Sequence, residues 1–242
     1  MLRRIVPLAA LLVAFVPAGS TAATHDGKPK ILLHLTHPTT KGILCDRGAL
    51  TDCSDADVNG DLYPNGKAYF LYVEVARGDL PDLAGMQLSV DYDRAPLSGV
   101  DIFGWTYCVE AHFEAPGPYG AWPAPLSSNL MVWDASTNCQ SGETAIAGYF
   151  YLAAYTPDVF RILPRQVDQA SRVGSCDAVT RTLAARDIGR VAFSSGAATP
   201  GCNPCVEDCT TTTPLGKAIP PASVPVLTAT WSSVKSLFST AP

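Results

Sequence analysis

Four oxygen-bearing side chains alternate along one short acidic stretch of the chain, in a pattern that can bind a cation. They are Asp55, Asp57, Asn59 and Asp61. Together with Gly60 they match the first half of an EF-hand loop, in which alternate oxygens surround a calcium ion. The second half does not match, because Gly66 stands where that loop needs a bidentate glutamate. The stretch therefore predicts either a loose Ca2+ site or a solvated Asp/Asn turn, and we favour the turn.

A second group of polar side chains falls on one expected strand. Glu110, His112 and Glu114 are two residues apart, so on a strand they share one face at a spacing of about 7 Å. A secreted hydrolase using Glu110 and Glu114 is our least favoured alternative, because glycoside hydrolysis needs two carboxylates across a cleft. The sequence contains no serine-hydrolase elbow, zinc-protease motif or phosphate loop. We therefore expect a solvated polar face and no enzyme.

The segment 116–125 is rich in glycine and proline and contains Tyr119 and Trp122. Aromatic side chains on such a loop can present flat faces to sugar rings, so one alternative is a carbohydrate-binding module that uses these two residues. The interpretation we favour is that Trp122 closes one end of the apolar core, because large aromatic side chains dominate cores.

Eight cysteines are distributed along the chain. They are Cys45, Cys53, Cys108, Cys139, Cys176, Cys202, Cys205 and Cys209. An even number of cysteines in an exported protein predicts a disulfide framework. Proximity along the sequence favours the pairs Cys45–Cys53 and Cys108–Cys139.

The last four cysteines also have a metal-binding interpretation. Cys202, Cys205 and Cys209 form a C-x2-C-x3-C cluster that, with Cys176, offers four thiolates to a tetrahedral zinc ion. Disulfides are the favoured interpretation, because an oxidising compartment favours them and the paired C-x2-C knuckles of zinc sites are missing.

The first 23 residues predict a secretory signal peptide. Arg3 and Arg4 precede an apolar run at 5–16 and small residues at 18–23. That run is too short to cross a bilayer, and no later segment approaches the roughly 20 apolar residues that a membrane span needs. We therefore expect a secreted or cell-surface protein without a transmembrane segment.

Composition limits the partners and the class of fold. The 22 acidic residues exceed the 17 basic ones, which gives a net charge of −5, so nucleic acid is not an expected partner. Hydrophobic residues make up 47% of the chain, enough for a sizeable core.

Alternation of apolar and polar residues runs through the chain, and helical periodicity is almost absent. Nine strands are predicted, at 30–36, 67–77, 85–92, 100–114, 129–134, 144–155, 159–163, 166–173 and 188–194. In the segment 100–114, Phe103, Trp105 and Tyr107 should share the packed face. Only 177–186 predicts a short helix. The pattern is typical of an all-β, antiparallel β-sandwich of immunoglobulin-like or jelly-roll type, expected over residues 28–209.

The composition changes after the last cysteine. Residues 210–229 are rich in threonine and proline and predict a stiff linker. Residues 230–242 form a short amphipathic tail whose apolar side chains recur at helical spacing: Trp231, Val234, Leu237 and Phe238. So short a helix needs a surface to dock on, either this domain or a partner, and we favour a partner.

The stretch 65–93, with the run LAGMQLSVDYD at 83–93 and Ala95-Pro96-Leu97 after it, resembles the early strands of cohesin modules. Further motifs resemble a group of uncharacterised exported bacterial proteins: the Phe-x-Trp-x-x-Cys strand, the Trp-Pro loop, AGYFY at 147–151, Asn-Pro-Cys at 203–205 and the Trp-Lys-Leu-Phe tail. The resemblance implies a cohesin-like sandwich and a non-catalytic role.

The sequence thus predicts a secreted binding, adhesion or structural module at the bacterial cell surface. Its expected partner is a protein or a glycan of the cell envelope.

Overall fold

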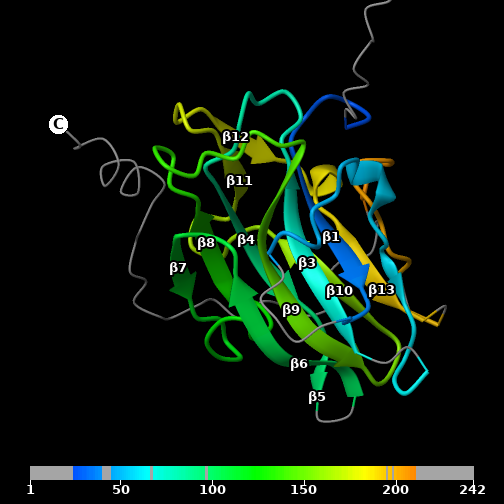
Figure 1. The fold of residues 1–242 in the computed structure, drawn as a ribbon. Coiled ribbons are helices and arrows are strands. Elements are labelled where there is room, and N and C mark those ends of the chain that lie inside the picture. The colour runs from blue at the N-terminus through cyan, green and yellow to red at the C-terminus, as the bar shows by residue number, and fades with distance from the viewer. Residues whose placement is uncertain are drawn as a thin grey trace, which may run out of the picture.

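Two β-sheets lie face to face across one main apolar core (Figure 1). The computed structural model describes residues 24–39, 45–65, 68–95, 98–194, 196–197 and 199–210. Alternate residues of the strands point into the core, because successive side chains of a strand lie on opposite faces. In β3 (Tyr69–Ala76), for example, Leu71 and Val73 are buried in the main core, whereas Phe70 and Tyr72 belong to a separate cluster on the outer face.

The first sheet has five strands in the order β1-β3-β9-β6-β5. Their bounds are β1 (Lys30–Thr36), β3 (Tyr69–Ala76), β9 (Thr144–Ala154), β6 (Ser98–Tyr107) and β5 (Arg94–Ala95). All of the pairs are antiparallel. The strand β5 pairs only with the first two residues of β6.

The second sheet follows the order β12-β11-β4-β10-β13-β2, and β8 joins β4 to β7 beside this path. Its strands are β12 (Thr180–Leu183), β11 (Ser171–Gly174), β4 (Gly85–Asp91), β10 (Asp158–Leu163), β13 (Arg190–Phe193), β2 (Asn59–Gly60), β8 (Ser128–Val132) and β7 (Ala111–Ala115). Two short 3-10 helices complete the elements, η1 (Cys53–Asp55) and η2 (Ala185–Asp187). Within the described ranges, no helix has the length and apolar character needed to traverse a membrane.

The predicted all-β sandwich is confirmed, and three of its predicted elements are wrong. The helix expected at 177–186 is instead β12 followed by η2. The single strand expected at 100–114 is two strands in different sheets, because the chain leaves the first sheet after Tyr107 and enters the second at Ala111. The strand expected at 166–173 forms only at its end, as β11.

The packed face expected for β6 is also interrupted. A β-bulge between Ile102 and Gly104 inserts Phe103 as an extra residue, which breaks the two-residue alternation. Trp105 still packs against the core, but 52% of Phe103 is exposed.

Three of the four disulfides connect cysteines that lie far apart in the sequence, and the fourth closes a loop of 7 residues. The pairs are Cys45–Cys108, Cys53–Cys205, Cys139–Cys176 and Cys202–Cys209. The predicted pairs Cys45–Cys53 and Cys108–Cys139 are therefore wrong, because strand pairing brings distant segments closer together than neighbours in the sequence. The zinc alternative is also wrong, since all four of its sulfurs are bonded to other sulfurs.

Three predicted segments fall outside the described residues. They are the signal peptide at 1–23, the linker from 211 onward and the tail at 230–242 with Trp231, Val234, Leu237 and Phe238.

Candidate binding surface

The outer face of the five-stranded sheet carries rows of aromatic side chains. Register places Phe70 opposite Tyr151 and Tyr72 opposite Tyr149, so these four residues of β3 and β9 form two adjacent cross-strand pairs. Their rings contact one another, with centroids 5.1 Å apart for Phe70 and Tyr149 and 5.3 Å apart for Tyr72 and Tyr149. Aromatic pairs at such distances add to the stability that burial alone provides.

One end of this face is covered by the segment 45–58. The disulfide from Cys45 attaches the segment to Cys108 at the end of β6. Gly48 lies directly on the ring of Tyr72, where an added Cβ would come within 2.5 Å of the ring carbons. Only glycine allows so close an approach without a shift of the ring, and the segment therefore seals this end of the sheet.

Glu74 is buried beneath the same segment. Its side chain has no exposed surface, and Oε2 accepts a hydrogen bond from the backbone N–H of Leu50 at 3.5 Å. The atom Oε1 is buried without a hydrogen-bond partner. Burial raises the pKa of Glu74 to about 8, because the charged form loses its hydration. At neutral pH this side chain is largely a protonated, uncharged acid.

The other end of the aromatic face is open. Phe103 of β6 is 52% exposed and Tyr151 of β9 is 40% exposed, and their ring centroids lie 5.3 Å apart. Phe70 supports Tyr151 from the opposite side at 5.7 Å. We call Phe70, Phe103, Tyr149 and Tyr151 the aromatic ridge. Two exposed rings held on a rigid sheet form the kind of surface that binds partners.

A hollow of about 410 Å³ lies beside the ridge, between β6 and the segment 121–124. Its lining consists of Tyr92, Arg94, Asp101, Ile102, Phe103, Gly104, Trp105, Ala121, Pro123 and Ala124. Phe103 therefore belongs both to the ridge and to the hollow. Binding sites for small molecules have volumes of this order. The lining of this hollow exposes more polar than apolar surface.

The two aromatic residues predicted to bind sugar do not form one platform. Trp122 is only 8% exposed and packs edge-on against Trp105, with centroids 5.4 Å apart. It therefore closes the end of the core, as the favoured interpretation held. Tyr119 is 48% exposed. Their loop contributes to the hollow through Ala121, Pro123 and Ala124 instead.

The predicted calcium residues lie along η1 and the extended chain that follows it. Asp57 accepts a hydrogen bond from the backbone N–H of Asn59 at 3.1 Å, and the backbone N–H of Asp57 donates to Nδ1 of His34. Asn59 and Asp61 line a second hollow of about 420 Å³. Over the described residues, Asp55, Asp57 and Asp61 do not belong to any trio of His, Cys, Asp or Glu ligand atoms within 4.8 Å of one another. The calcium site stays a prediction.

Of the three polar residues predicted to share one strand face, only His112 and Glu114 lie in β7, and all three stabilise their own chain. Glu110 lies between β6 and β7, where it accepts from the backbone N–H of Asp134 at 3.0 Å and from the amide of Asn138. Glu114 accepts from the hydroxyl of Tyr107 at 2.5 Å, and the ring of His112 stacks on Tyr107 at 3.7 Å. These contacts fix β7 and the turn after β8.

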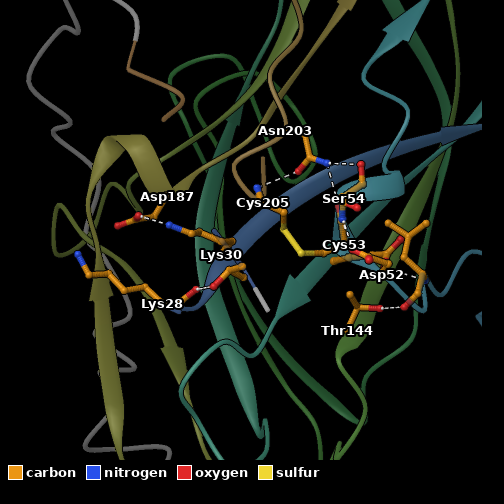
Figure 2. Close-up of a disulfide and its surroundings, with 12 residues drawn as sticks. Lys28, Lys30, Asp52, Cys53, Ser54, Thr144, Asp187, Asn203 and Cys205 are labelled. Carbon is orange, nitrogen blue, oxygen red and sulfur yellow. Dashed lines mark hydrogen bonds and ion pairs between the residues drawn. A yellow bond between two sulfur atoms is a disulfide. The ribbon is translucent and has the colours of Figure 1, made fainter. Parts of the chain in front are cut away.

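A buried ion pair and a disulfide connect the two ends of the described chain (Figure 2). Nζ of Lys30, a fully buried residue, lies 2.7 Å from Oδ1 of Asp187 and 2.8 Å from Oδ1 of Asp26. Burial alone would raise the pKa of Asp26, but the hydrogen bond from Lys30 lowers it to about 2. Close by, the amide of Asn203 donates to the carbonyl oxygen of Cys53, which is bonded to Cys205.

Sequence reasoning did not identify the residues of the ridge, nor the two charged residues in the lining of the hollow, Arg94 and Asp101. Tyr149 and Tyr151 alternate in a recognisable strand, so their shared face was visible in the pattern. The exposure of Phe103 was not, because the bulge that causes it has no local signature. Glu74 was detectable as the single charge in the apolar strand YFLYVEVA.

Comparison with known proteins finds similarity only in solved structures. No protein-family model and no curated protein matches the chain. A type II cohesin of the Acetivibrio cellulolyticus cellulosome has a TM-score of 0.41 and 7% identity, covering 69% of this chain and 95% of its own.

Two further cohesins are similar to the same extent. The sixth cohesin of Acetivibrio cellulolyticus scaffoldin B, solved with a Cel5 dockerin, has a TM-score of 0.40 and 9% identity over 68% of this chain and 97% of its own. The cohesin module of a Clostridium perfringens family 33 glycoside hydrolase has a TM-score of 0.38 and 9% identity, covering 69% of this chain and 96% of its own. The agreement with the resemblance in the sequence concerns the fold alone.

Proposed function

We propose that this chain is an exported, non-catalytic binding module that attaches to a component of the bacterial cell envelope through its aromatic ridge. The observation that carries the proposal is the open end of the five-stranded sheet, where Phe103 and Tyr151 are exposed side by side. Exposed aromatic side chains on a rigid support bind partners well, because they bury a large area and lose little conformational freedom.

Two further features support this function. Four disulfides are typical of proteins that fold outside the cytoplasm, which agrees with the predicted secretory signal. The carboxylates that a hydrolase would use, Glu110 and Glu114, instead hold turns and strands of their own chain. A surface module without a reaction accounts for both features.

The test is adsorption of the purified, fluorescently labelled mature protein to isolated bacterial cell envelopes. Tyr151→Ser should reduce adsorption at least tenfold, because it removes one exposed ring of the ridge. Val206→Ser is the matched control, since Val206 is 57% exposed but lies after β13, outside the ridge and the hollow. Both variants should keep the melting temperature of the parent. Equal adsorption of the parent and Tyr151→Ser would rule the ridge out as the binding surface.

A further inference from the structure

The hollow beside the aromatic ridge opens along an unpaired strand edge. β6 pairs with β9 on one side, whereas β5 covers only Ser98 and Gly99 on the other. Within the described part of the chain, no strand pairs with residues 101–107 on that side. Backbone N–H and C=O groups along this edge are therefore available to a ligand in the hollow.

The bulge at Phe103 restricts what can bind along this edge. A peptide that added a strand to β6 would need a continuous row of backbone groups. The bulge interrupts the ladder between Ile102 and Gly104, and bulges are one means by which proteins protect sheet edges from strand addition. A compact ligand that sits beside the bulge fits this geometry better than an extended peptide.

Two residues that line the hollow, Arg94 and Asp101, carry opposite charges. The carboxylate of Asp101 can accept two hydrogen bonds, and the guanidinium of Arg94 can donate several. Over the described residues, neither side chain takes part in an ion pair or a side-chain hydrogen bond. Such a wall complements a neutral ligand that carries adjacent hydroxyl groups, because each hydroxyl both donates and accepts. An acidic ligand would gain little from this wall, because the repulsion of Asp101 offsets the attraction of Arg94.

Three of the other residues that line the hollow are aromatic. Phe103 is exposed, Trp105 is half-buried, and Tyr92 is held in place by its hydroxyl, which donates to the carbonyl oxygen of Pro123 at 3.1 Å. Flat rings bind the apolar C–H face of a sugar ring, while hydroxyl groups around that ring reach the charged wall.

We propose that the hollow binds a neutral sugar ring of an envelope glycan, with Phe103 as the stacking platform and Arg94 and Asp101 as the partners of its hydroxyl groups. This inference rests on the proposed function and names the chemical class of the envelope component. It also moves the predicted carbohydrate site from Tyr119 and Trp122 to β6 and β5.

Calorimetric titration of the mature protein tests the inference. The probes are neutral hexasaccharides of glucose, xylose and N-acetylglucosamine, and a hexamer of galacturonic acid is the acidic counterpart. At least one neutral hexasaccharide should bind more tightly than the acidic one. Asp101→Asn and Arg94→Gln should each weaken that binding roughly tenfold, because each removes a charge-assisted hydrogen bond.

A blocking variant and a matched control complete the design. Gly104→Gln should abolish binding without harming the fold, because an added Cβ at Gly104 meets no atom within 4 Å. Asp55→Asn changes an exposed carboxylate outside the hollow and should leave the affinity unchanged.

Failure of the inference is distinguishable from failure of the proposed function. If no neutral hexasaccharide binds, or if Gly104→Gln binds as the parent does, the sugar site is wrong. If adsorption to envelopes then still depends on Tyr151 and is lost when the envelopes are digested with protease, the chain is a binding module for a protein. Binding of an extended peptide that Gly104→Gln abolishes would likewise replace the sugar with a peptide.

Discussion

Phe103 and Tyr151 lie on neighbouring strands with ring centroids 5.3 Å apart, although the bulge removes Phe103 from the ladder that joins β6 and β9. The bulge thus has two effects. It turns an aromatic side chain out of the core and onto the surface, and it places that side chain between the ridge and the hollow. A regular strand would have buried Phe103 and left the hollow without its exposed ring.

Stability should depend on pH through Glu74. Its folded pKa of about 8 exceeds the ordinary value of 4.5, so the folded state binds the proton more tightly than the unfolded state. The resulting stability is fully present below pH 4.5 and is lost as pH rises through about 8. Glu74→Gln should remove this dependence and stabilise the protein at pH 8.5 by on the order of 4 kcal/mol relative to the parent.

Urea unfolding at pH 5.0 and pH 8.5 measures this effect. Glu207→Gln, an exchange at an exposed glutamate, is the control and should follow the parent. Parallel curves for the parent and Glu74→Gln at the two pH values would contradict a buried, protonated Glu74.

Lys30 should contribute far more to stability than its neighbour Lys28. Lys30→Met removes the cation that compensates the buried carboxylate of Asp187, so it should lower the free energy of unfolding by about 3–5 kcal/mol. Lys28→Met removes only an exposed contact with Asp26 at 3.7 Å and should cost less than about 1 kcal/mol. Urea unfolding at pH 7 compares the two. Equal losses would show that the burial of Lys30 has no energetic consequence.

The disulfides should differ in how much each contributes to the free energy of unfolding. Loss of Cys53–Cys205, which spans 152 residues, should cost roughly twice as much as loss of Cys202–Cys209, which spans 7, because the longer loop restricts the unfolded chain more. Thermal unfolding of two variants, one with both cysteines of Cys53–Cys205 replaced by alanine and one with both cysteines of Cys202–Cys209 replaced, measures the two losses. Peptide mapping without reduction should recover the four pairs of the structure. Recovery of a Cys45–Cys53 peptide would contradict the fold of segment 45–58.

Calcium should leave the melting temperature unchanged if the favoured turn is correct. Asp57→Ala should still lower stability by about 1 kcal/mol without calcium, because Asp57 accepts the hydrogen bond from the backbone of Asn59. Melting curves in millimolar calcium and in chelator test this. A rise of the melting temperature with calcium that disappears in Asp57→Ala would establish the metal site, because a ligand that binds only the folded state stabilises that state.

The sequence by itself determined the class of fold, because the alternation of apolar and polar residues is a local property of a strand. Most of the strands, such as β3 and β9, were therefore predictable. The eight cysteines likewise indicated a disulfide framework, because their even number and the expected export are properties of the sequence alone.

Tertiary structure decided the rest. Cysteine pairing follows from which strands lie side by side, and Cys53 meets Cys205 only because the sandwich brings both ends of the domain together. The candidate site depends on tertiary structure in the same way. Phe103 and Arg94 lie on different strands, and no local pattern shows that a bulge exposes the first and that the hollow joins it to the second. Burial of Trp122 and Glu74 was also decided by distant segments, because exposure is a property of everything that packs around a side chain.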